Sequence, residues 1–229
     1  MKRLLIAVLA SLAAVAAPGA AAPGQAQAQR DWTQTVVATP EGGFRMGNPD
    51  APLRIVEFVS LSCPHCRHFA QEGAPALVRD HVRSGHASFE IRAYPLDILA
   101  STAAQLNRCL APAHAFAFND EILATQEQWF GRVEAMTPEQ INELESASGA
   151  EQRRRIAAAL GWSDAAARHG LGPAQARACL DDEAGFDRLE AIKEAATAMG
   201  VQGTPSFLLN GRLLPDVYDW AGLQPLLAR

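Results

Sequence analysis

The chain has 229 residues, of which 48% are hydrophobic, and 20 Lys and Arg against 25 Asp and Glu give a net charge of −5. This composition fits a globular protein and gives no indication of a nucleic-acid partner. The four cysteines are an even number, which fits a compartment in which disulfides persist.

The first 28 residues have the pattern of a secretory signal peptide. Lys2 and Arg3 precede an apolar run over 4–17, and Ala26-Gln27-Ala28 offers small residues for cleavage. The apolar run is shorter than the ~20 residues that a membrane-spanning helix needs. We therefore predict a periplasmic mature chain that begins near Gln29. Its net charge is about −7, because cleavage removes two basic residues.

Strand patterns cluster at the two ends of the mature chain. The predicted strands cover 36–37, 44–46, 53–59, 89–94, 206–209 and 212–214. The range between Tyr94 and Pro205 is rich in Ala and helical, and glycines at 149, 161 and 170 separate successive helices. Apolar positions from Phe186 to Met199 mark the last helix. The pattern predicts a small α/β sheet with a long helical insertion.

The most informative motif is Cys63-Pro64-His65-Cys66, between an apolar strand and a helix. Pro64 suits the first helical position, so Cys63 is predicted near the N-cap, where unpaired backbone N–H groups favour a thiolate. Cys66 is expected one turn further along, shielded by the helix. We predict that Cys63 is the reactive thiol and Cys66 the resolving thiol.

The Cys63-Pro64-His65-Cys66 motif has other possible interpretations. Haem attachment requires His directly after the second Cys, where this chain has Arg67. Zinc or copper binding through Cys63, Cys66 and His65 or His68 stays open, because soft thiolates suit Cu(I). An inert disulfide clip is weaker, because a helix N-terminus makes thiols reactive and so small a loop constrains the unfolded chain little.

Two side chains near the motif have candidate roles. His65, on the first helical turn, can lower the pKa of Cys63, although an exposed surface histidine is the alternative. Glu57 lies within the apolar strand, where burial would raise its pKa and make it a candidate proton acceptor. The alternative for Glu57 is an edge-strand residue that reaches solvent.

A second motif, Gly203-Thr204-Pro205, precedes the strand at 206–209. Proline is tolerated at the start of a strand. Local sequence favours an ordinary trans bond before Pro205 over a cis bond.

Together, the run 57–66 that ends in the Cys motif, the helical insertion and Val201-Gln202-Gly203-Thr204-Pro205 resemble the DsbA family of thioredoxin-fold thiol oxidoreductases. The resemblance implies a thioredoxin-like α/β fold with an inserted α-helical domain and a cis Pro205 beside the cysteines. It also implies that the Thr204 backbone pairs with substrate, Cys63 attacks, His65 stabilises its thiolate, and Glu57 lies beneath Cys66. Thr204 stands where DsbA proper usually has Val, and this departure is similar to the isomerase and reductase branches.

Cys109 and Cys179 both lie in the predicted insertion. A structural disulfide between them is the expectation, since some DsbA-like proteins carry such a pair and free thiols are a liability in an oxidising compartment. The alternative is two separately buried small hydrophobic side chains.

These observations define the expected organisation and function. We predict a signal peptide over 1–28, a thioredoxin-like domain over 29–97 and 199–229, and a helical insertion over 98–198. The predicted activity is that of a periplasmic thiol:disulfide oxidoreductase that introduces disulfides into secreted proteins, with a reductase or isomerase and a copper-handling chaperone as alternatives. No metal and no cofactor beyond the Cys63–Cys66 disulfide are expected. The expected partners are unfolded secreted proteins with free thiols and a membrane redox protein that reoxidises the monomer.

Overall fold

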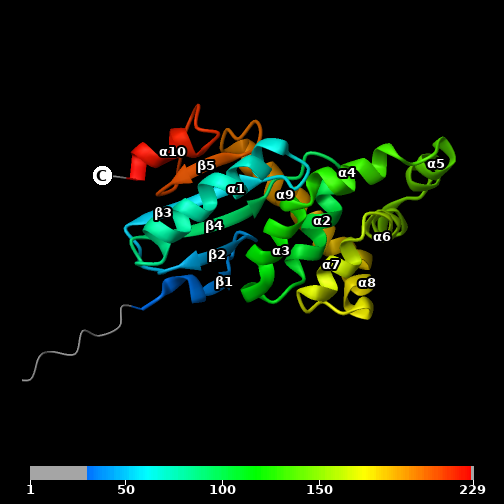
Figure 1. Cartoon of the computed structure of the whole chain (residues 1–229), viewed down its shortest axis with the longest axis horizontal. Helices are drawn as coiled ribbons and strands as arrows, with labels where there is room; N and C mark the ends of the chain where they lie inside the picture. The colour runs from blue at the N-terminus through cyan, green and yellow to red at the C-terminus, as the bar shows by residue number, and fades with distance from the viewer. Residues whose placement is uncertain (1–29, 228–229) are drawn as a thin grey trace, which may run out of the picture.

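A central sheet organises the computed structural model, which describes residues 30–227 (Figure 1). The strand order is β1-β2-β4-β3-β5-β6, and only the central pair β3 and β4 is parallel. The strands are β1 (Val36–Ala38), β2 (Phe44–Gly47), β3 (Leu53–Val59), β4 (Ala87–Ala93), β5 (Ser206–Leu209) and β6 (Arg212–Leu213). All six predicted strands are present, with ends that differ by at most two residues. The predicted signal peptide lies outside the described residues.

The helices fall into one long run between β4 and β5 and a few elements beside the sheet. Those beside the sheet are η1 (Trp32–Gln34), α1 (Pro64–Leu77), the π-helix η2 (Val78–Val82) and α10 (Trp220–Leu227). The run comprises α2 (Ile98–Arg108), α3 (Pro112–Ala124), α4 (Gln126–Glu134), α5 (Pro138–Ser146), α6 (Gly149–Ala159), α7 (Trp162–Arg168), α8 (Pro173–Asp181) and α9 (Glu183–Ala198). Within residues 30–227, no helix has the length and apolar character needed to cross a membrane.

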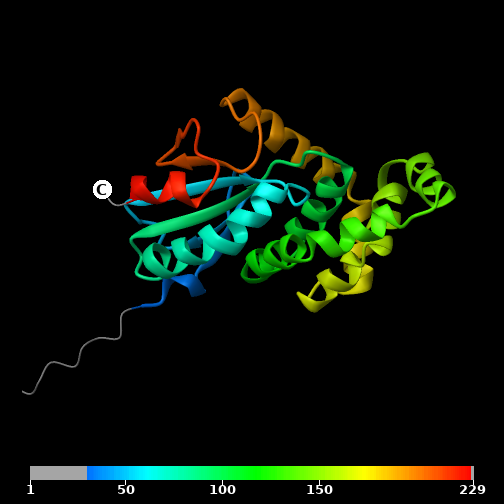
Figure 2. The same ribbon diagram turned by 45° about the horizontal axis from the view of Figure 1, so that its top comes forward.

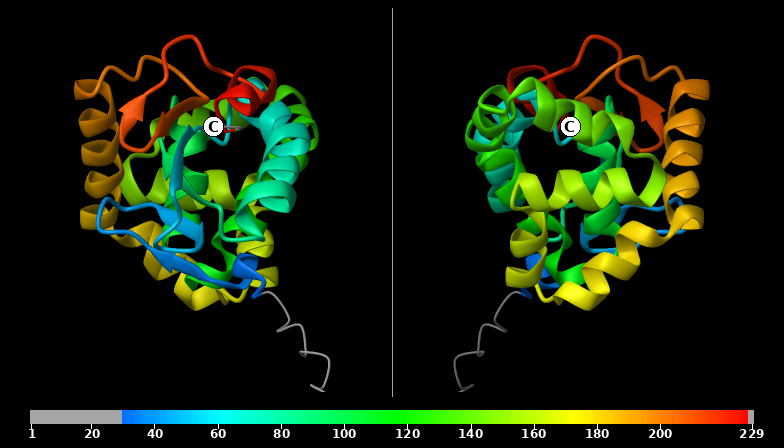
Figure 3. Two further views of the ribbon diagram at one scale, coloured as in Figure 1. Left: turned by 90° about the vertical axis from the view of Figure 1, so that its left-hand side faces the viewer. Right: turned by 90° about the vertical axis from the view of Figure 1, so that its right-hand side faces the viewer.

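The two faces of the sheet are covered by different helices. Ile55 and Val59 of β3 join the main core, which includes Phe69 of α1, while Val56 and Phe58 face the opposite side with Ala196 of α9. This follows from the alternation of side chains along a strand. The end-on views show α1 and α9 on opposite sides of the sheet (Figure 3). In the tilted view, α4 to α8 extend beyond one end of the sheet (Figure 2).

The expected helix signals are found, with one difference. Thr137 and Gln140 form a capping box at the start of α5. Met199, expected on the apolar face of the last helix, is 46% exposed because α9 ends at Ala198 and Met199 caps it. The chain leaves the helix there and no longer follows its apolar stripe.

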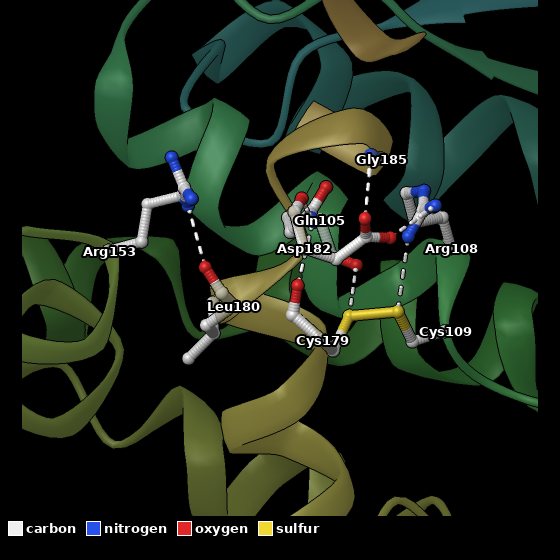
Figure 4. Close-up of a disulfide and its surroundings, with 8 residues drawn as sticks. All are labelled: Gln105, Arg108, Cys109, Arg153, Cys179, Leu180, Asp182 and Gly185. Carbon is white, nitrogen blue, oxygen red and sulfur yellow. Dashed lines mark hydrogen bonds and ion pairs between the residues drawn. A yellow bond between two sulfur atoms is a disulfide. The ribbon is translucent and has the colours of Figure 1, made fainter. Parts of the chain in front are cut away.

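A disulfide joins Cys109, at the end of α2, to Cys179 in α8. Polar contacts surround it (Figure 4). The buried Gln105 side chain donates hydrogen bonds to the carbonyl oxygens of Cys179 (2.7 Å) and Asp182 (2.9 Å), and Arg108 pairs with Asp182 at 3.0 Å. α2 is therefore linked covalently to α8 and by polar contacts to Asp182, which connects α8 and α9.

Candidate active site

The two thiols of the Cys motif lie at the start of α1, in different environments. Cys63 is the N-cap residue in an extended conformation, and Pro64 occupies the first helical position. Cys63 is 5% exposed and Cys66 is fully buried, while Pro64 and His65 are exposed. Neither cysteine is in a disulfide in this structure.

The environment of Cys63 favours its thiolate. The pKa of Cys63 is lowered to about 5, chiefly by a hydrogen bond from the Cys66 thiol, with further contributions from Thr204 and from the backbone N–H groups of Cys66 and His65. Burial opposes this effect but does not outweigh it. At neutral pH, Cys63 is therefore a thiolate and a good leaving group.

Cys66 has the opposite character. Burial raises the pKa of Cys66 well above its usual value, and the charges of Cys63 and Glu57 add to the effect. This thiol therefore holds its proton when Cys63 has lost its own. In the reduced motif, Cys63 is therefore ionised while Cys66 is protonated.

Thr204 and Pro205 face the motif from the start of β5. The peptide bond between them is cis, and the Cys63 thiol donates a hydrogen bond to the Thr204 carbonyl oxygen at 3.2 Å. The Thr204 hydroxyl is buried and has no hydrogen-bond partner. It is free to donate to the sulfur once Cys63 has ionised, which accounts for the contribution of Thr204 to the low pKa.

Glu57 lies in the middle of the central strand β3. It is 3% exposed, and its in-register neighbours are Ile91 on β4 and Phe207 on β5. Burial raises the pKa of Glu57 well above its usual value, with smaller contributions from Asp120 and Cys63. The alternative of an edge-strand residue in solvent is excluded, and Glu57 is a carboxyl group suited to holding a proton near Cys66.

The group of His65 that contributes to the low pKa of Cys63 is its backbone N–H. Among the described residues, no hydrogen bond joins the His65 imidazole to Cys63. The predicted pair Cys109 and Cys179 lies in the helical run and supplies no group to this site. No cluster of three or more His, Cys, Asp or Glu side chains within residues 30–227 could hold a metal ion.

Gln126, at the start of α4, is a site residue that sequence reasoning missed. Its buried side-chain amide donates to the carbonyl oxygens of Leu61 at 3.0 Å and Cys63 at 3.2 Å. Arg67 of α1 also forms an ion pair with Glu127. No local pattern marks Gln126, because its partners are more than 60 residues away in sequence. The helical run thus holds the backbone that carries the reactive thiol.

Loss of the Gln126 amide should destabilise the fold. Gln126→Ala leaves two buried carbonyl oxygens without a donor, so the free energy of unfolding should fall by about 1–3 kcal/mol in denaturant titration. Gln128→Ala, two residues along on the exposed side of α4, is the matched control and should change it by less than about 0.5 kcal/mol. Equal effects in the two variants would show that the Gln126 hydrogen bonds contribute nothing specific.

Thr204→Val should raise the pKa of Cys63 above about 5, because it removes the unpaired Thr204 hydroxyl that contributes to the low pKa. At pH 5 the rate of Cys63 alkylation should fall about 3- to 10-fold, as expected for one hydrogen bond to a charged group. His65→Ala is the comparison, since it removes the imidazole and keeps the backbone N–H. The pKa of Cys63 in each of the two variants is measured by titrating the thiolate absorbance with pH. If the titration curve of His65→Ala overlays that of the parent, the imidazole does not stabilise the thiolate. If the curve of Thr204→Val overlays that of the parent, the Thr204 hydroxyl does not stabilise it.

Comparisons with known proteins agree with this geometry. A family model described as Thioredoxin matches residues 39–229. The crystal structure of a protein-disulfide isomerase from Novosphingobium aromaticivorans is 33% identical and covers 82% of this chain and 98% of its own, with a TM-score of 0.75. Alpha-DsbA1 from Wolbachia pipientis, at 21% identity over 80% of this chain and 87% of its own, has the same fold with a TM-score of 0.56.

Curated relatives point in the same direction. A protein from Rickettsia bellii, provisionally named a protein-disulfide oxidoreductase, is 25% identical over 75% of this chain, and a similarly named protein from Rickettsia typhi is 26% identical over 72%. The matched regions span 58% and 54% of the lengths of these two relatives.

Proposed function

The chain belongs to the thioredoxin family, and from this premise we propose that it is a DsbA-like protein-disulfide oxidoreductase that transfers its Cys63–Cys66 disulfide to secreted proteins. One observation carries the proposal. The pKa of Cys63 is lowered to about 5, while burial raises that of Cys66 well above its usual value. Stabilisation of the Cys63 thiolate favours the reduced form, so the oxidised form readily gives up its disulfide.

The reaction proceeds by two thiol–disulfide exchanges. A substrate thiolate attacks the Cys63 sulfur, the Cys63–Cys66 bond breaks, and Cys66 leaves with the electron pair and takes up a proton. A second substrate thiolate then attacks the substrate sulfur of the mixed disulfide and releases Cys63 as a thiolate. The substrate has lost two electrons, and the enzyme holds them as two reduced cysteines.

The loop before β5 offers a surface for an extended substrate. Thr204 is half-buried next to Cys63, and the Ser206 hydroxyl donates to the Gly203 carbonyl oxygen at 2.8 Å, which fixes the turn. Backbone pairing with Thr204 would recognise a peptide by its main chain, as in strand addition. Such recognition suits an enzyme that must accept many unfolded sequences.

We infer a periplasmic monomer that reacts with unfolded secreted proteins and is returned to the disulfide form by a membrane redox protein. No bound cofactor is required, since the disulfide is the reagent. The thioredoxin-like unit would comprise 29–97 and 199–229, with 98–198 as the helical insertion.

A second candidate of the same chemistry is a disulfide isomerase. Two observations favour it, namely Thr204 before the cis proline and the name of the Novosphingobium relative. The two candidates differ in the redox state that is active. An oxidase acts with the Cys63–Cys66 disulfide, whereas an isomerase must start with a reduced Cys63.

One in vitro experiment separates the two functions. The oxidised protein is mixed with a reduced peptide that carries two cysteines, and disulfide formation is followed by mass spectrometry. We expect one peptide disulfide for each Cys63–Cys66 disulfide consumed. Rapid correction of a scrambled substrate by the reduced protein, without such transfer from the oxidised one, would favour the isomerase.

A further inference from the structure

A cavity of about 260 Å³ lies between α1, α3 and the sheet. Most of its wall is apolar and includes Ala70 and Ala74 of α1 and Phe116 of α3. Two acids line the same cavity. Glu57 is buried at the centre of the sheet, and Asp120 on α3 is exposed, so the cavity joins a buried carboxyl group to one that reaches solvent. Its volume is sufficient for several water molecules.

Glu57 has no hydrogen-bond partner inside the protein for one of its oxygens. Oε1 is buried and unpaired. The two strands beside it contribute Ile91 and Phe207 in register, which carry no protons to exchange. The titratable groups that act on Glu57 are Cys63 at the start of α1, together with Cys66, and Asp120 from α3. Apart from the two thiols, Asp120 is therefore the titratable group of the described residues whose charge acts on Glu57.

The exchange reaction requires a proton at Cys66. When the disulfide opens, the Cys66 sulfur leaves as a thiolate in an environment that strongly favours the thiol, and Glu57 is the acid that faces it. Glu57 must then regain a proton before the next cycle, and it must give one up when the disulfide is formed again. Because Glu57 has apolar surroundings on its other sides, we take the cavity as the route by which its proton exchanges with solvent.

We propose that Asp120 passes protons between solvent and Glu57 through this cavity each time the Cys63–Cys66 disulfide is opened or closed. The inference rests on the proposed function only in taking these two cysteines as a redox pair. Desolvation of its carboxyl group raises the pKa of Asp120 to about 6 even though the residue reaches solvent. Near neutral pH both protonation states are populated, which suits a proton carrier.

The test measures opening of the disulfide by dithiothreitol in a single turnover, followed by acid quenching and thiol labelling, from pH 5 to pH 8. Dithiothreitol serves as the reductant because its attack on the disulfide releases Cys66, which must then be protonated. This step occurs whether or not the protein oxidises peptides. Asp120→Asn should slow the reaction about tenfold, less than the ~100-fold or greater loss typical of a direct general acid. Asp120→Glu should retain at least half of the parent rate. The pH midpoint should move down in Asp120→Asn, because the negative charge that raises the pKa of Glu57 is gone.

Controls separate proton transfer from a structural or purely electrostatic role. Asp164→Asn removes one exposed acid elsewhere and should stay within twofold of the parent. Alkylation of reduced Cys63 should be unchanged in Asp120→Asn. Asp120→Ala should be slow in dilute buffer and recover with added formate, a small acid that can enter the opened cavity mouth.

Two results would overturn the inference. One is an Asp120→Asn rate equal to that of the parent at every pH. The other is a slow Asp120→Ala variant that formate does not restore, since a group needed only for structure or charge would behave in this way. If the Asp120 effects appear with dithiothreitol and the parent fails to oxidise the two-cysteine peptide, the proposed function fails and this inference stands.

Discussion

Cys63→Ala should abolish dithiol oxidation, whereas Cys66→Ala should accumulate mixed disulfides with its substrates. The reason is the different placement of the two thiols. The Cys63 sulfur lies at the N-cap of α1, with a pKa lowered to about 5, and Cys66 is fully buried one turn along. Without Cys63 no sulfur is positioned for attack, and the rate should fall at least about 1,000-fold.

Trapping gives the clearest readout for this prediction. Cys66→Ala retains the Cys63 thiolate, so it can attack substrate disulfides, and it lacks the thiol that would resolve the adduct. Non-reducing gels and mass spectrometry of the adducts identify the sulfur that is bonded. Cys63→Ala serves as the matched control and should form no adducts. Adducts that map to Cys66 in the Cys63→Ala variant would reverse the assignment of the two roles.

The double substitution of Cys109 and Cys179 by Ala should lower the free energy of unfolding by about 4 kcal/mol. The bridge closes a loop with a sequence separation of 70, and its removal gives the unfolded chain more conformational freedom. Denaturant titration at constant pH measures the change. The hydrogen bonds from Gln105 to Cys179 and Asp182 involve backbone oxygens and can persist, so the loss reports on the covalent link.

The same double variant should retain most of the activity of the parent at temperatures where it is folded. The bridge joins α2 to α8 and supplies no reacting atom to Cys63. A change of less than about 1 kcal/mol would show that the disulfide constrains little. Loss of peptide oxidation in a fully folded variant would show that the bridge supports the active site directly.

Local features of the active site could be predicted from the sequence. The N-cap position of Cys63 and the helical position of Pro64 follow from an apolar strand that is succeeded, a few residues later, by a proline, and both are found. The apolar residues on both sides of Glu57 indicate a buried strand, and Glu57 is buried in it. These features depend on residues within a few positions of one another.

Features that depend on tertiary contacts could not be predicted. Gln126 and Asp120 lie on α4 and α3, and each acts on the strand or turn that carries Glu57 and Cys63. Nothing in their neighbouring residues separates them from the other polar side chains of the helical run. The exposed imidazole of His65 illustrates the same limit, because a position on the first helical turn does not fix the direction of the side chain.

The oxidation state of Cys63 and Cys66 in the native compartment tests the central claim most directly. Cells are quenched in acid to stop thiol exchange, free thiols are labelled, and the two cysteines are mapped by mass spectrometry. The resting state of an enzyme that donates disulfides is the oxidised form, so we predict that Cys63 and Cys66 are bridged in most molecules. A pair that is mostly reduced would contradict the oxidase and identify a reductase or isomerase instead.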